Sequence, residues 1–247
     1  MKIVDINGCI GYDLKTVAPP VMPETLIREL DRSGTDCAVV WHTRSLMQIL
    51  DGNADVQAAA DASRGRLLPC YMVHPYMDDI QMPKDLKGYL RKHRPACVTI
   101  APKNHKYPLI SRYCGEMLQA LEELRIPVLL RTSTVPGYDE KVLAIADEYP
   151  NLPIVISHYG YTCSMFLRTA MRTTKNIYVN LGFIENASEL NQLVREYGAD
   201  RFLLGSTAGL LTGGAMGLVY LGEFTQEEKE KMLGGNWQRL QEDIQWT

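Results

Sequence analysis

The sequence predicts an α/β protein with the architecture of a (β/α)8 barrel, the TIM barrel. Eight short apolar runs recur along its 247 residues, and segments with helical periodicity separate most of them. Strands that alternate with helices form right-handed βαβ units and therefore a parallel sheet. Eight such units in about 250 residues are typical of a closed barrel.

The apolar runs give the positions of the predicted strands along the chain. In order, they are residues 3–6, 37–41, 67–73, 97–100, 128–130, 154–156, 177–181 and 202–204. Polar Asp5 and Asn7 alternate with the apolar residues of the first run, and Cys9 continues the same two-residue period, so these three residues are expected to share one face of the strand. The chain thus begins with an apolar strand that ends in a row of polar groups.

The predicted helices follow from apolar residues spaced three and four apart. One such face consists of Tyr138, Val142, Ile145 and Tyr149. A second, formed by Met117, Leu121 and Leu124, comes shortly before Pro127. Pro23 and Glu24 mark the start of the first helix, because proline suits an early helical position and an acid favours the positive end of the helix dipole.

A doubly wound open sheet is the alternative fold for this alternation of strands and helices. Its nucleotide-binding forms carry G-x-G-x-x-G after the first strand, whereas residues 7–11 read N-G-C-I-G. No stretch rich in Pro, Gly or Ser divides the chain. We therefore predict one barrel domain over residues 1–247.

The composition argues against several classes of partner. A formal net charge of -3 and a pI near 6.0 provide no basic surface, so we expect no nucleic-acid partner. No apolar run approaches the roughly 18 residues of a membrane span, and the N-terminus lacks a signal-peptide pattern, so we expect a cytoplasmic protein. The six cysteines form no C-x-x-C pair, and Cys37, Cys70 and Cys97 are expected to be buried as small hydrophobic side chains.

Chemistry-bearing side chains follow the predicted strands, at the barrel end where active sites lie. They are Asn7, Cys9, His42, His74, Lys103, Arg131, His158, Asn180 and Thr207. Three of the five histidines of the chain, His42, His74 and His158, belong to this set. The C-terminal mouth of the barrel is therefore the predicted site.

Five motifs, in the same order along the chain, resemble those of one enzyme family. Residues 3–9 (I-V-D-I-N-G-C) follow the frame I-x-D-x-H-x-H, and residues 127–131 (P-V-L-L-R) follow P-V-x-x-H. Residues 158–160 read H-Y-G against H-x-G, and residues 200–207 read D-R-F-L-L-G-S-T against D-R-x-L-x-G-S-D. Residues 232–240 resemble I-L-x-x-N-x-x-R-L. From first strand to last helix the chain resembles the amidohydrolase-related family of metal-dependent hydrolases and decarboxylases on the TIM-barrel fold.

The resemblance also implies that most metal ligands have been replaced. The family holds a divalent metal with two histidines of strand one, a histidine of strand five and an aspartate of strand eight, positions at which this chain has Asn7, Cys9, Arg131 and Thr207. Amide and hydroxyl groups are weak zinc ligands, and a guanidinium stays charged. Charges of +1 and +2 about 4 Å apart repel by roughly 8 kcal/mol at an effective dielectric near 20, against about 10–16 kcal/mol for binding at a good zinc site.

We therefore predict no metal at the family position and no other cofactor. His158, which the family uses near the metal-bound water, is retained. A relocated zinc site that uses Cys9, His42, His74 and His158 stays open as an alternative, because cysteine and histidine are suitable ligands, although their spacing matches no zinc motif.

One interpretation is a metal-independent hydrolase or C–C lyase acting on a small anionic molecule. In it Arg131 binds a carboxylate of the substrate, His158 is the general acid or base, and Cys9 is the nucleophile. The remaining substrate-binding candidates are Asn7, His42, His74, Lys103 and Thr207. Alternatively, Arg131 pairs with an inward acid such as Asp5, while His158 and Cys9 have structural roles.

The other interpretation is a non-catalytic pseudoenzyme that binds a small anionic ligand or a protein partner. It accounts for four replaced ligand positions without new chemistry. We favour the enzyme because the polar strand-end groups are retained. The family resemblance also implies a homodimer.

Overall fold

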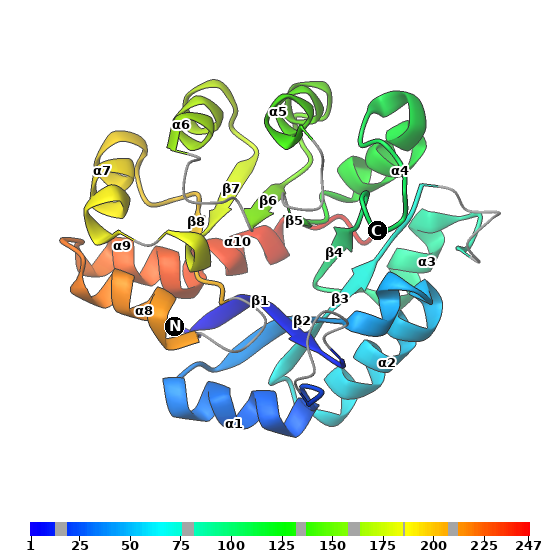
Figure 1. The fold of residues 1–247 in the computed structure, drawn as a ribbon, viewed down its shortest axis with the longest axis horizontal. Helices are drawn as coiled ribbons and strands as arrows, with labels where there is room; N and C mark the ends of the chain where they lie inside the picture. Colours follow the sequence, from blue (N-terminus) through cyan, green and yellow to red (C-terminus); the bar gives the residue numbers. More distant parts are fainter. Residues whose placement is uncertain (13–18, 76–81, 132–136, 158–163, 185, 207–211) are drawn as a thin grey trace.

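The predicted TIM barrel is confirmed. The computed structural model describes residues 1–12, 19–75, 82–131, 137–157, 164–184, 186–206 and 212–247. Each strand pairs in parallel with the next one along the chain, and the helices surround the sheet (Figure 1). The strands are β1 (Val4–Ile10), β2 (Cys37–His42), β3 (Leu67–Met72), β4 (Cys97–Ile100), β5 (Val128–Arg131), β6 (Ile154–Ser157), β7 (Ile177–Asn180) and β8 (Phe202–Leu203).

The helices cover the outer face of the sheet, and their bounds agree with the spacing of the apolar residues. They are α1 (Pro23–Ser33), the 3-10 helix η1 (Thr43–Leu46), α2 (Ile49–Ala62), α3 (Leu86–His93), α4 (Ser111–Leu124), α5 (Tyr138–Glu148), α6 (Ser164–Thr173), the 3-10 helix η3 (Leu181–Phe183), α7 (Ala187–Tyr197), α8 (Thr212–Leu221), α9 (Gln226–Glu230), the π-helical turn η4 (Lys231–Gly235) and α10 (Asn236–Glu242). Pro23 lies in the first turn of α1, as predicted, and Gly34 ends that helix in the left-handed conformation. None of the described helices has the length and apolarity needed to span a membrane.

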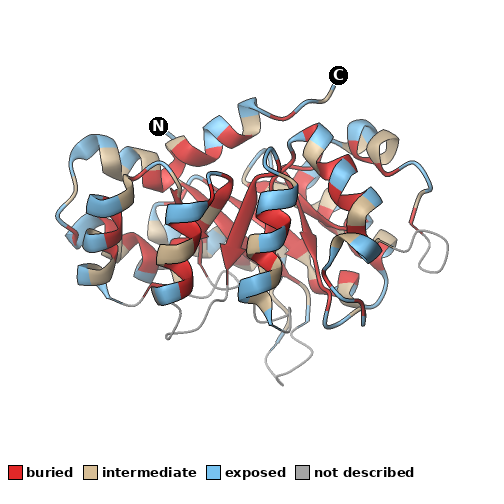
Figure 2. Cartoon of the chain, turned by 90° about the horizontal axis from the view of Figure 1, so that it is seen from above, coloured by how far each residue is buried: buried red, intermediate tan, exposed pale blue. Residues whose placement is uncertain are grey.

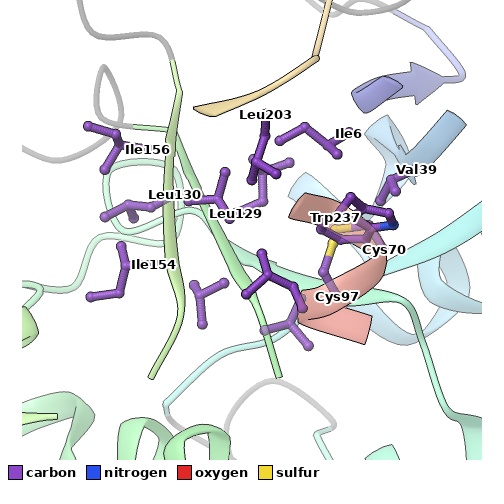
Figure 3. Close-up of a cluster of buried hydrophobic side chains, with 14 of the residues drawn as sticks. Ile6, Val39, Cys70, Cys97, Leu129, Leu130, Ile154, Ile156, Leu203 and Trp237 are labelled. Atoms are coloured by element: carbon purple, nitrogen blue, oxygen red, sulfur yellow. The ribbon is translucent and has the colours of Figure 1, made fainter. Parts of the chain in front are cut away.

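Buried residues make up the strands and the faces of the helices that turn toward the sheet (Figure 2). Inside the barrel, Ile6 and Leu203 lie near Leu129 (Figure 3). The side chain of Trp237, from α10, lies beside Cys70 and Cys97, and Gln241 of the same helix donates from Nε2 to the carbonyl of Ala96 at 2.8 Å (Figure 3). Helix α10 therefore packs at the end of the barrel where the strands begin, and the predicted burial of Cys70 and Cys97 is confirmed, as is that of Cys37.

The junction between the first and last strands depends on Asp5. The amide of Ile6 donates to the carbonyl of Leu204 at 2.9 Å, a backbone bond that links β1 to the end of β8. Oδ1 of Asp5 accepts a second bond, from the amide of Ser206, at 2.8 Å. The side chain of Asp5 thus helps to close the barrel.

The prediction that Asp5, Asn7 and Cys9 share one face is wrong. Asp5 lies opposite Ala38 of β2 and Gly8 lies opposite Val40, so three steps along β1 match two steps along β2. An extra residue of this kind breaks the two-residue alternation of a strand. Cys9, which lies opposite Trp41, therefore points to the other face from Asp5.

Candidate functional site

The centre of the candidate site is a contact between two strands that are not neighbours. The guanidinium carbon of Arg131, at the end of β5, lies 5.0 Å from the centroid of the Trp41 ring, near the end of β2. Strands β3 and β4 separate β2 from β5 in the sheet, so the Arg131 side chain reaches Trp41 through the barrel interior. A cation at this distance over an indole ring is attracted by the negative face of the ring.

The alternation of β5 explains why Arg131 points inward. Val128 and Leu130 lie beside Val142 and Ile145 of α5, on the outer face of the sheet. Arg131 is one residue beyond Leu130 and therefore points to the opposite, inner face. Trp41 is buried, whereas Arg131 is half-buried, so part of the arginine can still contact a ligand at the mouth.

Cys9 belongs to the same part of the mouth. It lies opposite Trp41 in the register of β1 and β2, and paired residues of parallel strands point to the same face. Cys9 as a whole residue is 9% exposed. The structure thus brings Cys9, Trp41 and Arg131 together on the inner surface at the barrel mouth.

Asn7 is placed by the irregular stretch of β1. Its backbone amide donates to Oδ1 of Asp5 at 2.9 Å, which fixes the turn of the chain before Cys9. Its side chain is buried, and Nδ2 has no hydrogen-bond partner within the part of the chain that the structure describes. A buried amide donor of this kind is suited to a carbonyl or carboxylate oxygen of a ligand.

His42 is oriented away from the Trp41–Arg131 contact. It follows Trp41 in β2, and alternation therefore places it on the outer face. Its Nδ1 accepts a hydrogen bond from the amide of Arg44 at 3.0 Å, which caps η1 and leaves the proton of a neutral ring on Nε2. Burial lowers the pKa of His42, while Asp55 raises it and Arg44 lowers it further.

The other predicted residues are dispersed. His74 is buried after β3 and packs against two rings, with centroid distances of 4.8 Å to Tyr107 and 5.3 Å to His105. Lys103 is exposed. Asn180 turns its Oδ1 to the amide of Gly182 at 2.9 Å, which caps η3. His158 and Thr207 lie outside the described residues.

Trp41 was predicted to lie at the end of a strand, but the sequence-based prediction gave it no role in the site. The position of Trp41 in β2 could have indicated its role. Trp41 comes two residues after Val39, whose side chain lies inside the barrel (Figure 3). Alternation from Val39 predicts that Trp41 also points inward. Its partner, however, is 90 positions further along the chain and is evident only in the closed barrel.

The described residues do not fit the divalent metal that the family resemblance implies. Within those residues, no group of three or more His, Cys, Asp or Glu side chains could hold a metal ion. Of the corresponding ligand positions, Asn7 and Cys9 offer an amide and a buried thiol, and Arg131 places a permanent positive charge at the mouth. The arrangement is suited to binding an anion.

The chain belongs to the amidohydrolase family. A family model described as Amidohydrolase matches residues 98–240, which is more than half of the chain. No curated protein matches the sequence. Membership thus follows from the family model, which includes β5 and Arg131 but not Asn7 and Cys9.

Solved structures agree with the fold over nearly the whole chain. An uncharacterized TIM-barrel protein from Bordetella bronchiseptica has a TM-score of 0.78 at 18% identity, covering 98% of this chain and 99% of its own. A 2,6-dihydroxybenzoate decarboxylase from Rhizobium has a TM-score of 0.75 at 13% identity, with 98% of each chain covered. A probable 2-pyrone-4,6-dicarboxylic acid hydrolase from Acinetobacter baumannii, with citric acid bound, has a TM-score of 0.74 at 15% identity, covering 98% of this chain and all (100%) of its own. At these identities the likeness shows the fold alone.

Proposed function

We propose that this protein is a hydrolase or C–C lyase that acts on a small anionic molecule, such as a carboxylate, at the C-terminal mouth of the barrel. The observation that carries the proposal is the guanidinium of Arg131, placed 5.0 Å from the Trp41 ring centroid. An arginine is weakly hydrated, stays charged and matches a carboxylate with two parallel hydrogen bonds. In this proposal Arg131 provides the positive charge that a metal provides in other family members.

The chemical step in this proposal uses Cys9 and His158. The Cys9 thiol shares the inner face with Trp41, so it belongs to the same site as the guanidinium, and a nearby cation favours the nucleophilic thiolate. His158 is the general acid or base, because an imidazole can both accept and donate a proton near neutral pH. Two of the similar structures are named as enzymes of carboxylate substrates, a dihydroxybenzoate and a pyrone dicarboxylic acid, which supports the same substrate class here.

A second candidate function is ligand binding without catalysis. Its support is that Asn7, Cys9 and Arg131 stand at ligand positions of the family while the described residues provide no alternative metal group. The buried Nδ2 of Asn7 and the guanidinium of Arg131 would then hold a small anion that is never transformed.

Elemental analysis tests the loss of the metal site. Protein purified without chelator is expected to contain far less than one equivalent of Zn, Mn or Fe, because Arg131 repels a divalent cation at the barrel mouth. The measurement is inductively coupled plasma mass spectrometry against a protein concentration from amino-acid analysis. One full equivalent that disappears in a His158→Ala variant would refute the prediction.

A turnover assay separates the enzyme from the binder. We expect the wild-type protein to convert at least one compound from a panel of lactones, amides and aromatic carboxylates, followed by mass spectrometry of substrate and product. The activity should be lost in Cys9→Ala. Cys37→Ala is the matched control, because Cys37 is also a buried thiol but is the first residue of β2, at the end of the barrel away from the mouth. A bound compound that is recovered unchanged would favour the second candidate.

A further inference from the structure

We propose that Trp41 is a positioning residue, whose indole face holds the Arg131 guanidinium at the barrel mouth in the orientation that binds an anion. This inference rests on the proposed function, because it assigns a role to a residue beside the arginine of that site. It follows from the arrangement of β2 and β5 rather than from any motif, since no predicted motif includes Trp41.

The side chain of Arg131 is long and has many possible rotamers. Arg131 is the last residue of β5, so its long side chain leaves the sheet at the mouth and is only half-buried. An unrestrained arginine at such a place would sample many rotamers, and binding a ligand would then carry the cost of ordering it. The contact with Trp41 selects the rotamers that cross the barrel.

The indole of Trp41 is a rigid group in a buried position. Trp41 is 4% exposed and lies opposite Cys9 in the pairing of β1 with β2. A buried aromatic side chain on a paired strand has few alternative rotamers, so it provides a fixed surface. Arg131 is therefore held by an element that does not move with it.

The face and the edge of a guanidinium take part in different interactions. A ring over one face of a guanidinium interacts through charge and leaves the N–H groups along the edge of the plane able to donate. A carboxylate binds along that edge through two parallel bonds. Trp41 and an anion can thus contact Arg131 at the same time, and the indole would pre-organise the site.

Nuclear magnetic resonance tests the position of Arg131 without any ligand. The Nε–Hε signal of Arg131, assigned by its loss in Arg131→Ala, should be displaced by the ring current of Trp41 in the wild type. In Trp41→Leu and Trp41→Met the signal should return toward the position of an unstacked arginine, and Trp41→Phe should retain part of the displacement. Trp246→Leu, which removes a half-buried indole near the C-terminus, is the matched control and should leave the signal unchanged.

Calorimetry with benzoate gives the effect on binding. Trp41→Leu is expected to weaken benzoate binding roughly three- to tenfold, because an arginine that the indole does not already orient must be ordered when the ligand binds. Trp41→Phe should recover most of the affinity, and Trp246→Leu should bind as the wild type does. Circular dichroism confirms that each variant is folded, and Trp41→Met replaces Trp41→Leu where the latter does not fold.

The two measurements separate this inference from the proposed function. An Arg131 signal that does not move in Trp41→Leu, or benzoate binding within twofold of wild type while Arg131→Ala abolishes it, would overturn the role of Trp41 and leave the anion site intact. A wild type that binds no benzoate counts against the proposed function, whereas the Arg131 signal still decides whether Trp41 holds the side chain.

Discussion

Asp5→Ala is expected to lower the free energy of unfolding by about 2–6 kcal/mol, since two buried backbone donors would lose their acceptor. Oδ1 of Asp5 accepts from the amide of Asn7 at 2.9 Å and from that of Ser206 at 2.8 Å. The second bond links β1 to the segment after β8, where the barrel closes. Urea denaturation, followed by circular dichroism, measures the change.

Asp5→Asn is the matched control for this prediction. The amide oxygen of asparagine has the same position and can accept the same two bonds, so the loss should be much smaller than for alanine. If Asp5→Ala and Asp5→Asn are equally stable, the two hydrogen bonds do not hold the barrel closed.

The carboxyl of Asp5 also predicts how stability depends on pH. Burial raises its pKa above the ordinary value of 3.8, and hydrogen bonds to Ser206 and Asn7 oppose this effect without cancelling it. The folded protein therefore binds the proton more tightly than the unfolded chain. The resulting stabilisation is complete below pH 3.8 and is lost as the pH rises through the raised pKa. As the pH falls from 7 to 4, the free energy of unfolding of the wild type should therefore increase relative to that of Asp5→Asn.

The fold could be predicted because the strands are short apolar runs between helices with clear periodicity. The apolar run of the first strand covers only residues 3–6, whereas β1 runs over Val4–Ile10; the ends of the other strands agree with their apolar runs to within one residue. Asp5, Asn7 and Gly8 interrupt the apolar pattern of β1, yet the whole strand is buried. A polar side chain inside a buried strand has bonding partners elsewhere in the fold, here the amide of Ser206, and the local pattern does not reveal them.

The site could be predicted only as a set of strand ends. The rule that residues two apart share a face fails in β1, because the extra residue between Asp5 and Gly8 changes the register against β2. The contact between Trp41 and Arg131 depends on the barrel closing, which no local pattern contains. His42 has the right place in the sequence but caps η1 instead. Strand ends thus identify the mouth, and alternation determines which of them point into it.

Arg131→Ala is expected to weaken the binding of small carboxylates by a factor on the order of 100 or more. Each hydrogen bond between a guanidinium and a carboxylate contributes about 1.5–3 kcal/mol, and a bidentate pair contains two of them. The half-buried position of Arg131 over Trp41 shields these bonds from competing water. Calorimetric titration with benzoate and with citrate measures the loss.

Two further variants determine whether geometry or charge is responsible. Arg32→Ala removes an exposed arginine from the last turn of α1, so it lowers the net charge equally and should bind as the wild type does. Arg131→Lys keeps the charge but not the planar fork, so it should recover only part of the affinity. Full affinity in Arg131→Lys would mean that a point charge is enough. Full affinity in Arg131→Ala would show that the guanidinium does not take part in anion binding. In the second case the positive charge at the mouth would need another explanation, such as a structural contact that stabilises Trp41 at the end of β2.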